Sequence, residues 1–320
     1  MEDQSIKGFP DLGININQNG LNIFFTNNDL LEKLNNKNNR SFGSKFLIEN
    51  LKEANIQRNT LPNKLNEINS KIEIAKFQKN IWKLLLLYFL PPFRRRINNK
   101  LNNLIYLSQK IKKGINNSFI NINFDLSEVS RMKYKRVQNS YKKLLDSNII
   151  WKVVSTTEVD QVKERSVANN AVVRVPTDIS LTHFQGISSN TKAFLFKNNR
   201  GIQTGKNIYI YPSFIILSLS DIQFEIIPLS KIFLSYETSN FLEKEFKPND
   251  SEIINHHWLY ANKDGSRDFR FAGNRKIPIM KYGIITFSNR KDFNAQFLFS
   301  NSDYARNFYW SLKSLIDSFS

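Results

Sequence analysis

Residues 293–319, FNAQFLFSNSDYARNFYWSLKSLIDSF, join a short apolar run to an amphipathic segment. Residues 295–299 have the composition of a strand, and from Asp303 to Phe319 apolar residues return at the spacing of one helix face. The residues on this face are Ala305, Phe308, Tyr309, Leu312, Leu315 and Ile316. Because an amphipathic helix must cover another apolar surface, we expect it to pack on a sheet.

The chain before this helix, from Trp151 onward, alternates short apolar runs with turn signals such as Pro212, Pro228 and Gly283. Antiparallel strands closed by one terminal helix would form a small, partly open barrel, and this outline resembles pleckstrin-homology and GRAM-like domains. The expected strands are Ile208–Tyr211, Phe214–Leu219, Phe224–Ile227, Ile232–Tyr236, Ile253–Tyr260, Ile277–Met280, Ile284–Phe287 and Ala295–Phe299.

A β-hairpin is predicted at residues 12–25, near the start of the chain. Leu12, Ile14 and Ile16 alternate with polar residues, and Asn19-Gly20 supplies the positive φ angles of a tight turn. An isolated hairpin is marginal in water, so we expect it to pack on another part of the chain.

Residues 28–150 are expected to be mostly helical. Short helices at 28–57 precede a longer one whose apolar residues recur with the 3.5-residue period of a coiled-coil seam. These residues are Leu61, Leu65, Ile68, Ile72, Ala75, Trp82, Leu86 and Phe89. Pro91-Pro92 should end this helix, and a second one from Phe93 should return antiparallel to it. The inward residues of the second helix are Ile97, Leu101, Leu104 and Ile111. On this interpretation Trp82 belongs to a core rather than to a lipid anchor.

A strand at 119–124 and a third helix through Val129–Leu145 complete the helical region. Asp125 stands three residues before Glu128, which is the spacing of a capping box. The fold class is therefore predicted as α+β. The expected regions are a hairpin at 1–27, a basic helical region at 28–150 and a β-rich domain with a C-terminal helix at 151–320.

Composition excludes several kinds of site. The 320 residues contain no cysteine, and this excludes disulfides, thiolate metal sites and a cysteine nucleophile. Three histidines are present. His256 and His257 are adjacent, so on a strand their side chains would point to opposite faces. The sequence GIQTGKN at 201–207 lacks the spacing of a phosphate-binding loop. No cofactor and no metal site are expected.

The chain is strongly basic, with a formal net charge of +18. Residues 91–150 hold 13 Lys and Arg against 3 Asp and Glu, so this segment carries more than half of the excess. Such a patch can attract phospholipid headgroups, nucleic acid or an acidic protein, or it can simply be a solvated helix face. The basic clusters are Arg94-Arg95-Arg96, Lys110-Lys112-Lys113, Arg131-Lys133-Lys135-Arg136 and Lys142-Lys143.

The longest apolar stretch, Leu84 to Leu90, is too short to span a bilayer, which takes about 20 apolar residues. Lys83 and Arg94 leave only ten uncharged positions between them. A segment that lies on a membrane surface is left open. The polar N-terminus has no signal-peptide pattern, so the expected location is the cytoplasm, with peripheral membrane attachment as an option.

Two stretches resemble a bacterial family of unknown function. Residues 10–21, PDLGININQNGL, resemble its "PG-hydrophobic-N-hydrophobic-S…G" opening, although Asp11 replaces the usual Gly and Asn17 a common Ser. Residues 257–271, HWLYANKDGSRDFRF, with Asn274, Pro278 and Tyr282-Gly283 beyond, resemble its "TW…NKDG..D.RF..N…P…YG" signature. The resemblance covers about half of the chain and implies homology and a shared fold, but it assigns no catalytic residue.

The tract from Trp258 to Gly283 is the densest candidate site. Trp258, Lys263, Arg267, Arg270 and Arg275 could bind anions, because Arg forks suit phosphate or carboxylate groups. Asp264 and Asp268, with Lys263, could alternatively form a metal-dependent hydrolase site. An Asp-Gly turn fixed by an ion pair is the simpler interpretation.

The sequence therefore predicts a non-enzymatic binding or adaptor protein that engages an anionic partner, either a phospholipid surface or an acidic protein. Nucleic-acid binding through the helical region is the alternative, and a hydrolase centred on Asp264 and Asp268 is less favoured. The candidate anion-binding residues are Trp258, Lys263, Arg267, Arg270, Arg275, Arg94, Arg95, Arg96, Arg131, Lys133, Lys135 and Arg136.

Overall fold

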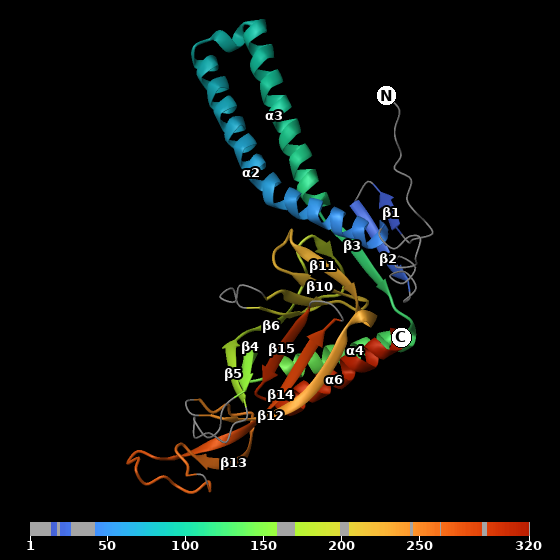
Figure 1. Cartoon of the computed structure of the whole chain (residues 1–320). Helices are drawn as coiled ribbons and strands as arrows, with labels where there is room; N and C mark the ends of the chain where they lie inside the picture. The colour runs from blue at the N-terminus through green and yellow to red at the C-terminus, as the bar shows by residue number, and fades with distance from the viewer. Residues whose placement is uncertain are drawn as a thin grey trace. The chain divides into compact units, whose positions relative to one another are not determined.

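The computed structural model describes residues 14–17, 20–26, 42–158, 170–198, 205–243, 246–262, 264–289 and 293–319. The chain has an α+β fold, as predicted, with antiparallel sheets and a C-terminal helix (Figure 1). It divides into two compact units. The first contains residues 1–123, 183–190 and 220–223, and the second contains the remaining residues.

The first unit contains the predicted hairpin, formed by β1 (Ile14–Asn17) and β2 (Gly20–Thr26). The strands are antiparallel, and Asn17 lies opposite Gly20 at the turn. The sheet order is β1-β2-β3-β7, where β3 is Ile120–Asp125 and β7 is Ile187–Ser188. The hairpin thus pairs with other strands, as its marginal stability requires. The predicted residues Leu12 and Asn19 lie outside the described residues.

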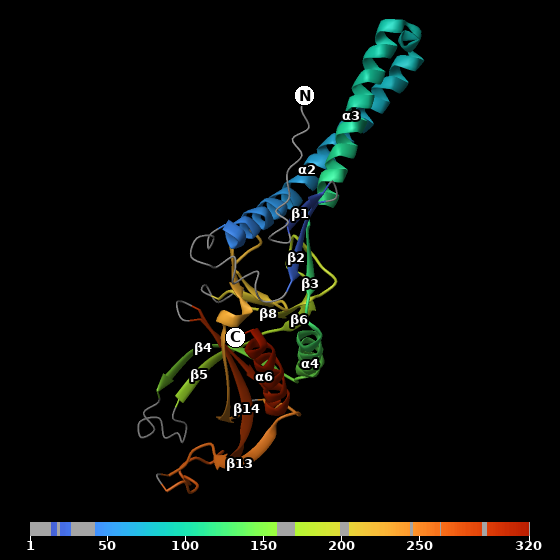
Figure 2. The ribbon, with the colours of Figure 1, turned by 90° about the vertical axis from the view of Figure 1, so that its right-hand side faces the viewer.

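Two long helices form the rest of the first unit. Helix α2 (Phe42–Leu84) and helix α3 (Pro91–Asn117) lie side by side, joined by the 3₁₀ turn η2 (Leu87–Phe89) (Figures 1 and 2). This confirms the predicted antiparallel hairpin. Ser108 Oγ donates to Asn69 Oδ1 at 3.2 Å, and Lys100 Nζ donates to Gln78 Oε1 at 3.2 Å across the pair. Helix α2 is longer than predicted, since it already begins at Phe42.

The predicted seam is only partly correct. Ile72, Ala75 and Ile97 are buried between the helices. Leu86 and Phe89 were expected to continue the seam, but α2 ends at Leu84 and both side chains are exposed. Leu86 has a φ of 56°, in the left-handed region, and so breaks the helix several residues before the prolines.

The first helix of the second unit is α4 (Glu128–Leu145), so the structure divides the predicted helical region 28–150 between the two units. Ser127, rather than Asp125, is the N-cap of α4, because its Oγ accepts the Ser130 N–H at 3.3 Å. Asp125 is instead the last residue of β3.

Two antiparallel sheets make up most of the second unit. One has the order β11-β10-β9-β8-β6 and the other β12-β14-β15-β4-β5, with β13 paired to the N-terminal half of β14. Strands β4, β5, β6 and β8 were not predicted. The strands are β4 (Ile150–Glu158), β5 (Asn170–Pro176), β6 (Ile179–Thr182), β8 (Ala193–Phe196), β9 (Asn207–Ile210), β10 (Phe214–Ser218), β11 (Phe224–Pro228), β12 (Phe233–Leu242), β13 (Glu252–Trp258), β14 (Lys276–Ser288) and β15 (Asn294–Phe299). The short 3₁₀ helix η3 (Leu229–Lys231) joins β11 to β12.

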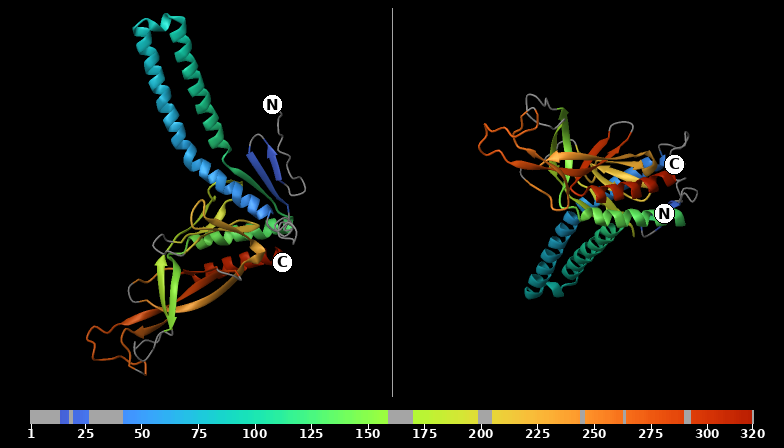
Figure 3. Two further views of the ribbon diagram at one scale, coloured as in Figure 1. Left: turned by 45° about the horizontal axis from the view of Figure 1, so that its top comes forward. Right: turned by 90° about the horizontal axis from the view of Figure 1, so that it is seen from below.

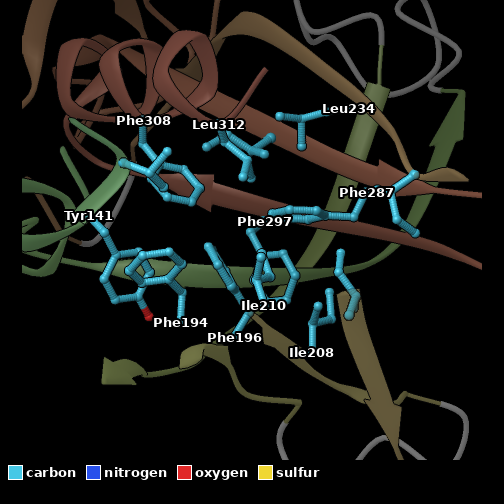
Figure 4. Close-up of a cluster of buried hydrophobic side chains, with 14 of the residues drawn as sticks. Tyr141, Phe194, Phe196, Ile208, Ile210, Leu234, Phe287, Phe297, Phe308 and Leu312 are labelled. Carbon is cyan, nitrogen blue, oxygen red and sulfur yellow. The ribbon is translucent and has the colours of Figure 1, made fainter. Parts of the chain in front are cut away.

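Helix α6 (Ser302–Ile316) closes this unit, followed by the 3₁₀ turn η4 (Asp317–Phe319). Asn301 caps α6, because its Oδ1 accepts the N–H groups of Asp303 and Tyr304. The predicted inward face is confirmed, with Ala305, Phe308, Leu312, Leu315 and Ile316 buried. Their side chains meet those of both sheets and of α4 in one core, which includes Tyr141, Phe194, Phe196, Phe287 and Phe297 (Figure 4).

Gly283 of β14 allows α6 to approach the sheet closely. A Cβ atom at this position would lie 2.8 Å from the Ala305 Cβ and 3.1 Å from the Ser302 Cα. We therefore expect Gly283→Ala to lower the free energy of unfolding by about 1–3 kcal/mol, since the helix must move outward. Gly273→Ala is the control, because no atom lies within 4 Å of its would-be Cβ. Equal midpoints of urea unfolding for the two variants would contradict this packing.

Lys152 of β4 is buried, and its Nζ lies 4.7 Å from the centre of the Phe297 ring. Burial lowers the pKa of Lys152 from 10.5 to about 8. Between these pH values the unfolded chain keeps a proton that the folded chain releases, so wild-type stability rises with pH in this window.

Lys152→Met should therefore stabilise the protein at pH 7, because it removes a buried charge. Its advantage over wild type should shrink by up to roughly 3 kcal/mol on going to pH 10. Urea unfolding of both proteins at the two pH values measures this difference. An advantage that does not change with pH would show that the Lys152 ammonium is hydrated in the folded protein.

Candidate functional site

The tract from Trp258 to Arg275 forms a loop between β13 and β14 that folds on itself. Gly265 has a φ of 81°, which favours glycine, and its N–H donates to the Asn262 carbonyl at 2.9 Å. Asp264 Oδ1 accepts the Ser266 N–H at 3.0 Å and the Ser266 hydroxyl at 2.7 Å. These bonds lower the pKa of Asp264. The Asp-Gly turn expected from the sequence is present.

Asp268 fixes the second half of this loop. Its side chain is only 2% exposed and accepts the Arg270 Nε at 2.9 Å and Nη2 at 2.6 Å. Asn274 Nδ2 donates to the Tyr260 carbonyl at 2.6 Å and to the Asp268 carbonyl at 3.0 Å. The Phe271 ring stacks on Tyr260 at 4.1 Å between centroids. The described residues of the NKDG..D.RF..N signature thus hold the loop in shape.

The two aspartates of the hydrolase alternative do not converge on one point. Asp264 is exposed in the turn, whereas both oxygens of Asp268 accept hydrogen bonds from Arg270. Among the described residues, no three His, Asp or Glu side chains are grouped as a metal site would require. Lys263, the third residue of that alternative, lies outside the described residues.

The loop instead presents Phe269, which is 82% exposed. The Arg267 guanidinium lies 5.3 Å from the centres of both the Trp258 and Phe269 rings. Arg270 is neutralised by Asp268, and the exposed Arg275 has its carbonyl bonded by the Leu259 N–H at 2.9 Å. Of the predicted anion binders, Trp258, Arg267 and Arg270 therefore make contacts within the loop.

A buried charge network lies in the sheet that contains β13 and β14. Arg174 of β5 forms an ion pair with Glu243 and stacks on Trp151 at 4.3 Å. The Tyr282 hydroxyl donates to Glu243 at 2.8 Å. Burial, and then this bond to a carboxylate, raise the pKa of Tyr282 well above its ordinary value. Tyr282 and the neighbouring Gly283, both in the signature, thus have structural roles.

The basic cluster on α4 lies beside α6. Arg131, Lys135 and Arg136 are exposed, whereas Lys133 is half-buried with its Nζ 3.1 Å from the Ser314 carbonyl. Lys133 and Arg136, together with Trp310, Ser311 and Ser314 of α6, line a shallow cavity of about 200 Å³. Trp310 was not predicted. It falls outside the apolar stripe of its helix. A Trp at such a position was the sequence signal that could have indicated a binding residue.

Arg94, Arg95 and Arg96 lie in the first two turns of α3, at the tip of the helical hairpin, and all three are exposed. The segment before them is apolar and exposed as well. The exposed apolar residues of the tip are Leu84, Leu85, Leu86, Phe89, Leu90 and Phe93, with Leu84 84% exposed. Trp82, just before the tip, packs edge-on against Phe93 at 5.7 Å. The tip therefore combines an apolar surface with three adjacent cations. The predicted seam did not indicate this surface, because it assigned Leu86 and Phe89 to a buried face.

Comparison with models of known protein families, with curated proteins and with solved structures finds no match to this chain. The resemblances to the bacterial family and to pleckstrin-homology-like domains therefore stay predictions.

The loop analysis predicts different effects for its two aspartates. Asp268→Ala removes the buried partner of Arg270 and should raise amide exchange across residues 259–274. Asp264→Ala should affect only the exposed turn around Ser266. Hydrogen exchange followed by mass spectrometry distinguishes the two patterns. Equal local effects of both substitutions would mean that Asp268 does not organise the loop.

Proposed function

We propose that this protein is a non-enzymatic adaptor that attaches to an anionic phospholipid surface through the tip of the α2–α3 hairpin. The tip is defined as residues 83–96, from the last turn of α2 to the second turn of α3. The observation that carries the proposal is the exposed apolar cluster from Leu84 to Phe93 directly beside Arg94, Arg95 and Arg96.

The apolar cluster gains free energy only if another apolar phase covers it. Transfer of a Leu or Phe side chain out of water contributes about 1.5–3 kcal/mol. Leu84, Leu86 and Phe89 are each more than two-thirds exposed, so most of this free energy is still available. A bilayer interface supplies such a phase, whereas the phosphates of nucleic acid do not.

The three arginines stand where the fold itself disfavours them. The N-terminus of a helix carries a partial positive charge, and the first turn of α3 has no acidic residue to offset it. Cations at this end interact unfavourably with the partial positive charge of the helix, but they attract anions. Each basic residue near an anionic membrane contributes about 1 kcal/mol to the free energy of binding. Once lipid is bound, this gain offsets the unfavourable interaction of the arginines with the helix dipole.

The geometry suits a surface contact rather than a span. No helix among the described residues is long and apolar enough to cross a bilayer. The chain enters the tip at Lys83 and leaves it at Arg96, with a 3₁₀ turn between. A short apolar turn between two charged helix ends would insert to the depth of the headgroups and first methylenes.

Co-sedimentation with phosphatidylcholine vesicles, with and without one-third phosphatidylserine, tests the proposal. Wild type should sediment with the anionic vesicles only. Replacing Leu84, Leu86 and Phe89 by Ser, or Arg94, Arg95 and Arg96 by Ser, should weaken binding by at least about tenfold. The arginine variant should also lose the salt dependence of binding.

The matched control replaces Lys110, Lys112 and Lys113 by Ser. These lysines are also exposed on α3 and change the net charge equally, but they lie toward its opposite end. The control should sediment like wild type. If it loses binding as strongly as the arginine variant, attachment depends on overall charge and not on the tip. Equal binding to neutral vesicles, or none to either, would also refute the proposal.

A further inference from the structure

Helices α4 and α6 lie side by side and antiparallel on the second unit (Figures 2 and 3). Lys133 contacts Ser314, and about two turns further along α4 Tyr141 contacts Phe308, which is earlier in α6, so the helices are antiparallel. Their inner faces share the core. Their outer faces leave the shallow cavity described above, and we call this the α4–α6 groove.

Trp310 is the feature of this groove that the fold does not explain. It is 60% exposed, while Phe308, Leu312 and Leu315 already cover the core. Its only ring contact among the described residues is edge-on with Tyr309, at 5.0 Å. Trp and Arg are the residue types that contribute most to protein–protein interfaces. Arg136, on the opposite wall of the groove, is exposed as well.

The charges of the two helices are unequal. Helix α4 has six Lys and Arg against one acid, Glu128. On α6, by contrast, Arg306 pairs with Asp303 and Lys313 pairs with Asp317. Within the part of the chain that the structure describes, none of the α4 cations has such a partner. The groove is therefore a basic surface with an aromatic residue at its edge.

We propose that the α4–α6 groove binds an acidic amphipathic segment of a partner protein. Carboxylates of that segment would meet Lys133 and Arg136, the hydroxyl of Ser314 would donate to them, and an apolar side chain would cover Trp310. Two helices that lie side by side offer ridges of side chains between which a third helix can pack. This extends the proposed function by giving the second unit a partner, and it does not depend on the membrane attachment, since the residues lie in the other unit.

Two other occupants fit the groove less well. Proteins that bind single-stranded nucleic acid stack successive bases on several aromatic residues, and the groove offers only Trp310 among its lining residues. A cavity of about 200 Å³ is smaller than the roughly 300–1,000 Å³ typical of small-molecule sites. An extended contact that uses the cavity for one side chain suits its size.

A peptide-display selection on the full chain tests the inference. A library of random 16-residue peptides is selected on wild type and counter-selected on Trp310→Ala/Arg136→Glu, in which both changed side chains are exposed. We expect enriched peptides with net negative charge and with Leu or aromatic residues three and four apart. Circular dichroism should show that the double variant unfolds at the wild-type temperature.

Fluorescence anisotropy then gives the affinity of the best enriched peptide. It should bind the double variant at least about tenfold more weakly than wild type. Lys142→Glu is the control, because it changes the charge of α4 as Arg136→Glu does but in the last turn. Its affinity should stay within about threefold of wild type, which corresponds to less than about 1 kcal/mol.

Three results would overturn the inference. The first is that no peptide distinguishes wild type from the double variant. The second is that the enriched peptides are basic or lack apolar residues. The third is that an oligothymidylate probe binds wild type more tightly than the peptides do and loses that binding in the double variant, which would assign the groove to nucleic acid. The double variant should bind vesicles as wild type does. A wrong inference about the groove can therefore be distinguished from a wrong proposal about membrane attachment through the tip.

Discussion

The close packing of α6 on β14 over Gly283 is the contact on which the second unit depends. It lets Phe308 and Leu312 reach the side chains of both sheets, so one helix closes a core that neither sheet could bury alone. Helix α4, which lies beside α6, completes this cover through Tyr141. Because these inner faces are fully used, the apolar side chains that stay exposed elsewhere stand out as candidates for binding.

The first unit shows the opposite situation at its tip. Between α2 and α3 the apolar residues Ile72, Ala75 and Ile97 are buried, but beyond Trp82 the helices no longer cover their own leucines. Left-handed Leu86 ends the helical path early and turns the apolar run outward. Three arginines follow in the first two turns of a helix, where they oppose its dipole. Both features lower stability in water, and the proposed contact with an anionic bilayer would make both favourable.

Much of this fold could be predicted from local periodicity. The C-terminal helix, the antiparallel helical hairpin and the Asp264-Gly265 turn each follow from a short pattern of side chains, and the structure contains all three. Periodicity shows that a face is buried but not what buries it. For that reason α4 was grouped with the long helices, although it packs on α6. Some strands were not predicted because their polar and apolar residues show no clear alternation. An example is β4, with the sequence IWKVVSTTE.

The candidate site shows the same limit. The sequence placed Trp258, Arg267, Arg270 and Asp268 in one tract and favoured a loop fixed by an ion pair, but only the structure identifies Arg270 as the partner of Asp268. Leu86 and Phe89 of the tip continue a heptad pattern, so the pattern predicts burial where the chain turns away and both side chains are exposed. Trp310 joins the α4 cations only through the antiparallel packing of two helices far apart in sequence. Such juxtapositions depend on tertiary structure and have no local signature.

On the proposed function, the tip enters the interface of an anionic bilayer. Trp82 lies beside the tip and can report this directly in a chain whose other tryptophans, Trp151, Trp258 and Trp310, are replaced by Phe. With vesicles of phosphatidylserine and phosphatidylcholine brominated near the top of the acyl chain, the emission of Trp82 should shift to the blue and be quenched. If the chain sediments with these vesicles while the emission of Trp82 stays unchanged, the tip does not enter the bilayer.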